Sequence, residues 1–117
     1  MKIESKSLFQ THFSSKEFSK RRESLMNQVE DEAIVIINGK RKEHELETFR
    51  QSNNFFYLSG VEVPGAILTI QSSEATLYLP AHDPQEERTE GPRLNSDRPD
   101  QVAELTGVSQ VRHLSDL

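Results

Sequence analysis

Two β-rich segments separated by only four polar residues constrain the fold of this chain more than any other feature. Residues 66–70 (Ala-Ile-Leu-Thr-Ile) and 75–79 (Ala-Thr-Leu-Tyr-Leu) carry the β-branched and aromatic side chains that strands favour. The four residues between them suffice only for a tight reversal, so the segments are predicted to form an antiparallel hairpin that ends at Pro80. This hairpin argues against a purely parallel sheet.

A helix is predicted to begin just after Ser14. Ser14 is a suitable N-cap, and Glu17 at the third helical position would complete a capping box. Phe13 and Phe18 flank the cap with the spacing of a hydrophobic staple. The apolar positions that follow on one helical face are Leu25, Met26 and Val29. Arg21 and Arg22 lie between them, and we expect their stems to cover this apolar stripe while their charged heads stay in water.

Two further segments are predicted to be strands. Residues 33–37 (Ala-Ile-Val-Ile-Ile) are apolar at every position, which indicates a strand buried on both faces. Residues 55–58 (Phe-Phe-Tyr-Leu) follow the turn-favouring pair Asn53 and Asn54, and they predict a strand that ends at Gly60. The charged residues 39–48 are predicted to be a loop.

The C-terminal third is predicted to contain two short helices and a last strand. Asp83 is the N-cap of a helix that begins at Pro84 and stops before Gly91. A second helix begins at Pro99 and closes at Gly107, with Val102 and Leu105 facing inward. Residues 108–112 are the candidate strand, and residues 114–117 look like the start of a further element.

These elements predict an α/β domain with a mixed sheet flanked by helices. Residues 1–13 are assigned to an N-terminal extension and residues 14–117 to the domain itself. A chain of 117 residues has the size of one domain and is long enough to bury a core.

Composition excludes several classes of function. The net charge is −5, and the basic cluster at residues 40–42 is followed at once by acidic residues, which argues against binding to nucleic acid. No apolar stretch approaches the length of a membrane span, and no secretory signal is present at the N-terminus. The absence of cysteine excludes disulfides and thiolate ligands. A cytoplasmic location is therefore expected.

Residues 82–87 form the densest cluster of potential metal ligands. His82 and three carboxylates within six residues are a donor set that suits Mn or Fe. Asp83 and Glu86 can instead be capping residues at the predicted helix start. We favour that interpretation, which requires no metal. The four histidines are scattered, and the sequence contains neither a phosphate-binding glycine motif nor a Gly-x-Ser-x-Gly elbow. The residues taken by themselves therefore predict no chemistry.

Residues 49–60 (Phe-Arg-Gln-Ser-Asn-Asn-Phe-Phe-Tyr-Leu-Ser-Gly) closely resemble a segment in the N-terminal domain of Xaa-Pro aminopeptidases, the aminopeptidase P members of the creatinase and prolidase group. The similarity extends in order along residues 14–117. The other matching positions are Arg21, Arg22, Leu25, Pro64, the 66–70 strand, Asp83, Glu87, Gly91, Arg93, Gly107 and Val108.

The resemblance implies that this chain has no catalytic residue, metal ligand or cofactor site of its own. In the family, a separate C-terminal catalytic domain holds two divalent metal ions, often manganese, through two Asp, one His and two Glu. The implied partners are that C-terminal domain of the same polypeptide and further copies in a homo-oligomer. A peptide substrate would be met only through the full protein. The N-terminal domain would help to assemble the oligomer and shape access to the active site.

The resemblance leaves a small set of candidate positions. Arg50, Gln51 and Asn53 are candidates for an interface or for a turn held by side-chain hydrogen bonds. Family members often carry Trp where this chain has Thr89, and Thr89 cannot offer a flat apolar wall to a substrate. Two alternatives remain open: the N-terminal domain of a creatinase-like or prolidase-like amidohydrolase, and a stand-alone interaction domain.

Overall fold

The computed structural model describes residues 10, 12–30, 32–41, 50–72, 74–90 and 94–117. Within them the order of elements is α2 (Ser15–Met26), β1 (Ile34–Asn38), α3 (Asn53–Ser59), β2 (Ile67–Gln71), β3 (Glu74–Leu79), α4 (Pro84–Glu90), α5 (Pro99–Thr106), β4 (Gln110–His113) and the 3₁₀ turn η1 (Leu114–Asp116). No helix in these ranges is both long and apolar enough to cross a membrane.

The four strands form one mixed sheet in the order β1-β2-β3-β4. β1 pairs with β2 and β2 with β3 in antiparallel fashion, whereas β4 pairs with β3 in parallel after a crossover that contains α4 and α5. The predicted hairpin is confirmed, with Thr69 opposite Thr76 at its centre. The predicted mixed α/β architecture is likewise confirmed.

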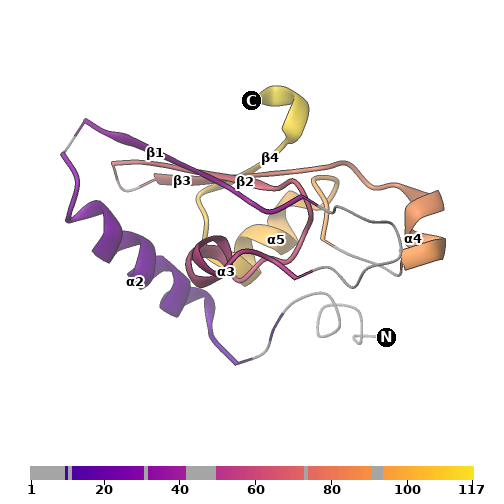
Figure 1. Cartoon of the computed structure of the whole chain (residues 1–117), viewed down its shortest axis with the longest axis horizontal. Helices are drawn as coiled ribbons and strands as arrows, with labels where there is room; N and C mark the ends of the chain where they lie inside the picture. Colours follow the sequence, from indigo (N-terminus) through magenta and orange to yellow (C-terminus); the bar gives the residue numbers. More distant parts are fainter. Residues whose placement is uncertain (1–9, 11, 31, 42–49, 73, 91–93) are drawn as a thin grey trace.

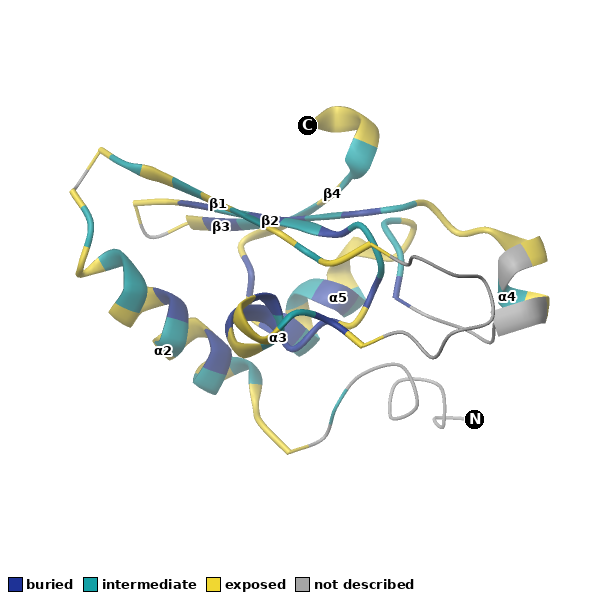
Figure 2. Ribbon diagram, in the orientation of Figure 1, coloured by how far each residue is buried: buried dark blue, intermediate teal, exposed yellow. Residues whose placement is uncertain are grey.

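Helices α2, α3 and α5 lie on one face of the sheet, and η1 lies on the other (Figure 1). The core fills the space between the three helices and the sheet (Figure 2). The sheet contributes Leu68, Ile70, Leu77 and Leu79, which alternate along β2 and β3 with half-buried or exposed residues, as expected for a sheet with one covered face. The helices contribute Phe18, Phe55, Leu58 and Val102.

Helix α2 begins where the sequence predicts, although the capping box is not formed. Ser14 is the N-cap, but its side chain makes no capping hydrogen bond. Glu17 instead turns outward and pairs with Arg21, one helical turn later, at 3.1 Å. The predicted staple is confirmed, since the rings of Phe13 and Phe18 meet edge to face with centroids 6.2 Å apart.

The predicted strand at residues 55–58 is wrong, because this segment is helix α3. Ser52 is its N-cap, and Gly60, with φ of 73°, is the left-handed residue that ends it. Phe55, Leu58 and Ser59 are buried, a spacing of three and four residues that is typical of one helical face. The preference of aromatic residues for strands depends strongly on context, so the left-handed Gly60 and the packing of α3 against α2 determine the outcome.

The prediction that the first strand is buried on both faces is also wrong. β1 is an edge strand, and its residues alternate between exposed and half-buried. Val35 and Ile37 pack toward the core, whereas Ile34 and Ile36 remain 56% and 61% exposed on the face without helices. The apolar run therefore indicated a strand correctly but not its surroundings, because α2, α3 and α5 all lie on the inner face of the sheet and leave the outer face of β1 uncovered.

The C-terminal elements follow the sequence closely. α4 and α5 begin at the predicted prolines, and Gly107, with φ of 78°, ends α5. Val102 is fully buried and Leu105 packs against the core, as predicted. The last strand is confirmed two residues later than predicted at its start, over Gln110–His113. Most of the predicted loop at 39–48 lies outside the described residues.

We expect truncation of the sheet to be costly only on its covered face. Leu68→Ala removes a side chain with no exposed surface and should lower the free energy of unfolding by about 2–5 kcal/mol, because it leaves a cavity. The matched variant Ile34→Ala, on the outer face, should cost less than about 1 kcal/mol. Urea unfolding followed by circular dichroism measures both, and equal losses would contradict the one-sided core.

Candidate functional site

A buried arginine joins three helices at the centre of the domain. The side chain of Arg22, on α2, is 4% exposed. Its Nη1 donates to the carbonyl of Leu58 at 2.8 Å, and its Nη2 donates to the carbonyl of Thr106 at 3.0 Å. Both carbonyls belong to helix ends, where backbone oxygens lack helical partners and the helix dipole is negative. One guanidinium therefore satisfies the C-terminal ends of α3 and α5 together.

This placement contradicts the expectation that both arginine heads lie in water. The prediction fails for Arg22 because two helices end against α2 and their terminal carbonyls need a donor. It also fails for Arg21, whose side chain is 12% exposed because its guanidinium packs against aromatic rings. Burial lowers the pKa of Arg22 to about 10, so the side chain keeps its charge at neutral pH. Its carbonyl partners lie 36 and 84 residues away along the chain, so no local sequence pattern identifies it.

Arg21 holds the neighbouring aromatic side chains together. Its guanidinium carbon lies 4.5 Å from the ring centroid of Phe13, 5.2 Å from that of Phe18 and 4.3 Å from that of Tyr57. Its Nη1 also donates to the carbonyl of Tyr57 at 3.0 Å. Cation–π contacts add about 0.5–1 kcal/mol at exposed sites and about 2 kcal/mol when desolvated, and the side chain of Arg21 is only 12% exposed. Arg21 therefore ties the start of α2 to α3.

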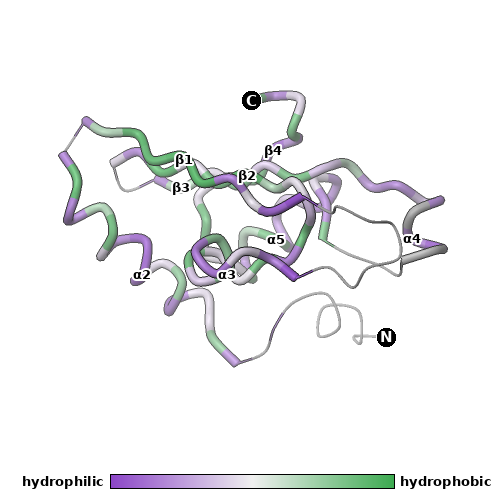
Figure 3. Tube along the Cα trace, viewed as in Figure 1, coloured by the Kyte–Doolittle hydropathy of each residue, from purple (hydrophilic) through white to green (hydrophobic). Residues whose placement is uncertain are grey.

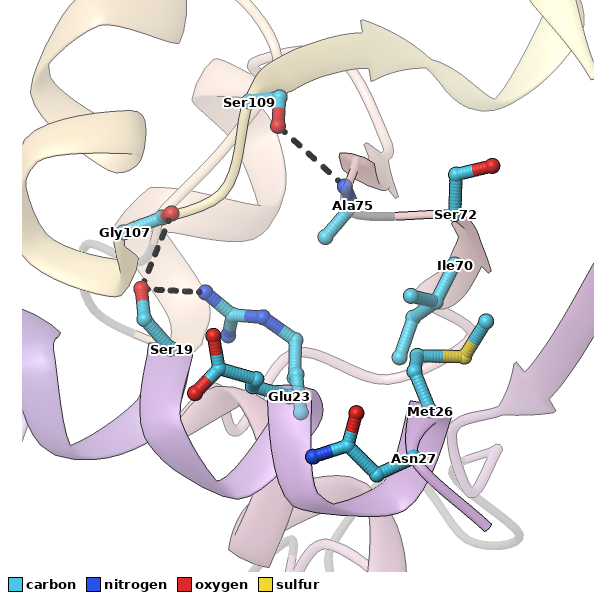
Figure 4. Close-up of a pocket in the computed structure, with 10 residues that line it drawn as sticks. Ser19, Glu23, Met26, Asn27, Ile70, Ser72, Ala75, Gly107 and Ser109 are labelled. Carbon is cyan, nitrogen blue, oxygen red and sulfur yellow. Dashed lines mark hydrogen bonds between the residues drawn. The ribbon is translucent and has the colours of Figure 1, made fainter. Parts of the chain in front are cut away.

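A pocket of about 320 Å³ opens beside Arg22, between α2, the turn of the β2–β3 hairpin and residues 107–109 (Figure 4). Its polar walls are engaged in fixing these segments to one another. The hydroxyl of Ser19 donates to the carbonyl of Gly107 at 3.4 Å, and the backbone N–H of Ala75 donates to the hydroxyl of Ser109 at 3.3 Å. A Cβ at Gly107 would lie 2.6 Å from the Ser19 hydroxyl, so the close approach of α5 to α2 requires glycine.

Gln51 fastens three stretches of chain at the opposite end of α3. Its Oε1 accepts the backbone N–H of Lys40 at 2.6 Å and that of Ser52 at 3.1 Å. Its Nε2 donates to the carbonyls of Val61 at 3.3 Å and Val63 at 3.2 Å. The buried amide thus links the end of β1 to the start of α3 and to the segment that enters β2.

The other two candidates from the same sequence segment lie at the surface. Arg50 and Asn53 are exposed, and Asn53 is the first residue of α3. The structure therefore separates the three: it buries Gln51 among backbone groups and leaves Arg50 and Asn53 open to solvent.

The residues around His82 do not converge on a metal. Nε2 of His82 lies 3.3 Å from a carboxylate oxygen of Glu87, and Oδ1 of Asp83 accepts the backbone N–H of Gln85 at 3.1 Å. In the ranges that the structure covers, no three His, Asp or Glu side chains are grouped so that they could hold a metal ion. The side chains of Glu86 and Thr89 lie outside the described set. The potential ligands among the described residues are therefore not arranged to hold a metal ion.

Solved structures similar to this fold include aminopeptidases P. The domain superposes on the low-pH form of Escherichia coli aminopeptidase P with a TM-score of 0.78 at 24% identity, over 91% of this chain and 26% of that one. A putative aminopeptidase P from Bacillus anthracis gives a TM-score of 0.76 at 26% identity, over 89% of this chain and 26% of that one. The fold is therefore that of one part of a larger peptidase.

Sequence relatives agree with this. Human Xaa-Pro aminopeptidase 3 is 31% identical over 120 residues, which covers 86% of this chain and 23% of that protein. Intermediate cleaving peptidase 55 of Schizosaccharomyces pombe is 30% identical over 93 residues, 71% of this chain and 19% of that protein. This chain spans about a quarter or less of the length of these relatives.

The family model described as "Aminopeptidase P, N-terminal domain" matches residues 18–117. The chain belongs to this family, and it corresponds to the N-terminal domain of an Xaa-Pro aminopeptidase, as the resemblance at residues 49–60 predicted.

We expect Arg22→Met to destabilise the domain strongly. The variant keeps an apolar stem but removes the donors of two helix-end carbonyls, so the free energy of unfolding should fall by about 2–4 kcal/mol. Arg50→Met removes an exposed arginine and should change it by less than about 0.5 kcal/mol. Urea titration of the two variants gives the comparison. A loss for Arg22→Met as small as that of its control would show that the carbonyls are satisfied in another way.

Gln51→Glu tests the amide clamp without a change of size. A carboxylate cannot donate to the carbonyls of Val61 and Val63, so we expect a loss of about 1–3 kcal/mol at pH 7. Facing those carbonyls raises the pKa of the introduced carboxyl in the folded state. Protonation therefore stabilises the fold, and part of the loss should be recovered between pH 7 and pH 5.

Thermal and urea unfolding at the two pH values measure this, with Gln110→Glu at an exposed position as the control. A loss that does not depend on pH, once the control is subtracted, would contradict the clamp.

Proposed function

We propose that this chain is the non-catalytic N-terminal domain of a metal-dependent Xaa-Pro aminopeptidase, a peptidase that releases the N-terminal residue preceding proline. The observation that carries the proposal is the match of residues 18–117 to a model of that domain alone. Support also comes from the names of relatives such as human Xaa-Pro aminopeptidase 3, which this chain matches over 23% of that protein's length. In this proposal the remainder of the parent polypeptide supplies the chemistry.

The C-terminal catalytic domain is the proposed location of two divalent metal ions, with manganese as the expected metal. Such a pair polarises the scissile carbonyl and generates the nucleophile from water. The role of this chain's own residues is to provide a rigid body beside that centre. The contacts of Arg22 and Gln51, which join helices and loops distant in sequence, support such a role.

The domain is further proposed to assist assembly of a homo-oligomer and to restrict which peptides reach the active site. An exposed position such as Arg50, at the start of the segment that resembles the family most closely, is available for contacts of this kind. A cytoplasmic location stays a prediction from the sequence.

Between the alternatives, the relatives favour the aminopeptidase. Similar proteins from human, mouse, rat and fungi of the genera Fusarium and Paracoccidioides carry Xaa-Pro aminopeptidase in their names. A creatinase-like or prolidase-like amidohydrolase remains the second candidate, because the same N-terminal fold would accompany a different activity there. The first helix and the Phe-Arg-Gln segment at residues 49–51 favour the aminopeptidase. A stand-alone interaction domain is the third, and the sequence downstream in the gene discriminates it from the other two.

We expect the 117-residue chain supplied with Mn²⁺ to release no N-terminal residue from an Xaa-Pro peptide. The parent protein, encoded by the reading frame through and beyond the codon of Leu117, should release it. The frame should continue for roughly one to two domains and encode two Asp, one His and two Glu in that order. Chromatography of the released amino acid, against a reaction without protein, measures turnover.

Turnover by the 117-residue chain would overturn the non-catalytic assignment. A frame that stops directly after Leu117, or continues without those five ligands, would leave the domain as a binding module. The matched control is the parent protein stripped of metal, which should lose activity and regain it on addition of Mn²⁺.

A further inference from the structure

Among the described residues, the outer edge of the first strand has no strand paired to it. β1 is the outermost strand, and its only partner in the described sheet is β2. The N–H of Gly39 donates to the carbonyl of Ala66 at 2.7 Å, so by the alternation of an antiparallel ladder Val35 and Ile37 also direct their backbone groups to β2. Ile34, Ile36 and Asn38 therefore direct theirs outward.

Strand edges of this kind are usually protected, and β1 is not. Its sequence, Ile-Val-Ile-Ile-Asn, contains no charge and no proline. Ile34 and Ile36 project from the outer face with more than half of their surface exposed, and the strand forms a continuous hydrophobic band (Figure 3). An apolar, exposed edge is a template for pairing with another strand.

We propose that this edge pairs with the same edge of a second copy of the chain, in antiparallel register about a two-fold axis at Ile36. The proposal rests on the oligomeric role proposed above and names the surface and the partner for it.

Self-pairing in this register satisfies every outward backbone group of the strand. Ile36 faces Ile36 of the second copy, and Ile34 faces Asn38 of the second copy on either side of the axis. These are the residues whose N–H and C=O groups point outward, so all three pairs are of the hydrogen-bonded type. Two four-stranded sheets become one continuous sheet, and the exposed Ile34 and Ile36 side chains of both copies meet on its outer face.

The inner face of β1 also offers an apolar surface to the second copy. A groove of about 740 Å³ lies between α2, β1 and α3, and its apolar walls include Leu25, Val35, Ile37 and Leu58. In the proposed register Val35 of one copy faces Ile37 of the other. Both point to the side of the sheet that carries this groove, so a second copy fills it with apolar side chains.

Charges at the two ends of the strand complement one another in the same register. Glu32 lies two residues before β1 and Lys40 lies two residues after it, and both are exposed. Neither forms an ion pair within the part of the chain that the structure covers. Glu32 lies in the turn that the Ala33 N–H closes onto the Glu30 carbonyl, just before the strand. Centring the pairing on Ile36 brings this end of each copy toward Lys40 of the other, where opposite charges attract. A shift of register by two residues loses this match.

The test is sedimentation equilibrium of the 117-residue chain and five variants. The wild-type chain should form a dimer with a dissociation constant on the order of 10 μM, as expected for a small interface. Ile36→Lys places two ammonium groups opposite each other on the axis, and it should raise the dissociation constant about 100-fold or more. Gln110→Lys makes the same kind of change on the outer face of β4 and should leave the constant unchanged.

Charge reversal tests the register itself. Glu32→Lys and Lys40→Glu should each weaken the dimer about threefold to tenfold, because each places like charges opposite one another. The double variant with both reversals restores opposite charges and should return to the wild-type constant. These charge reversals lie at the surface and leave the core intact. They therefore test the proposed pairing even if Ile36→Lys is poorly folded.

A wild-type chain that stays monomeric well above 10 μM would overturn the proposal. A dissociation constant that does not change in Ile36→Lys would also overturn it. So would a double variant that dimerises more weakly than either single variant. None of these outcomes touches the peptidase assignment, which depends on turnover by the parent protein. Conversely, an inactive parent would leave the measured dimer standing.

Discussion

The architecture depends on one buried guanidinium. Helices α3 and α5 both end against α2, and the carbonyls at their ends would be unsatisfied without the two donors of Arg22. A buried charge is stable here because the donors point at the negative ends of two helix dipoles. Gly107 belongs to the same constraint, since only a residue without Cβ lets α5 approach α2 so closely. Hydrogen bonds from one arginine therefore join the three helices inside an otherwise apolar core.

The sheet, by contrast, has one face covered by helices and one face open. Leu68 and Leu77 face the three helices and have no exposed surface, whereas Ile34 and Ile36 stand on the bare face. A domain that spans about a quarter of its relatives can leave such a face for another part of an assembly. The open edge of β1 shares this character, since Ile34 and Ile36 lie on it, and Val35 and Ile37 line the groove beneath it.

Local chemistry predicted much of the fold. The caps and prolines at Ser14, Pro84 and Pro99 marked three helix starts, and the four-residue spacer between two β-rich runs marked the hairpin. The helix at Asn53–Ser59 was missed because its aromatic residues outweighed two signals that were present: the spacing of Phe55 and Leu58, and Gly60 at the C-terminal end. The family was recognisable from residues 49–60, whereas no side-chain cluster pointed to a chemistry.

The sequence by itself determined the positions of most elements, the mixed sheet and the family, because caps, turns and hydrophobic spacing act over a few residues. Only the tertiary structure decided that Arg22 is buried, that Gln51 clamps three segments and that β1 is an edge with one bare face. Each of these depends on groups that are far apart along the chain, such as Arg22 and Thr106, which are 84 residues apart. Local sequence patterns do not predict such contacts.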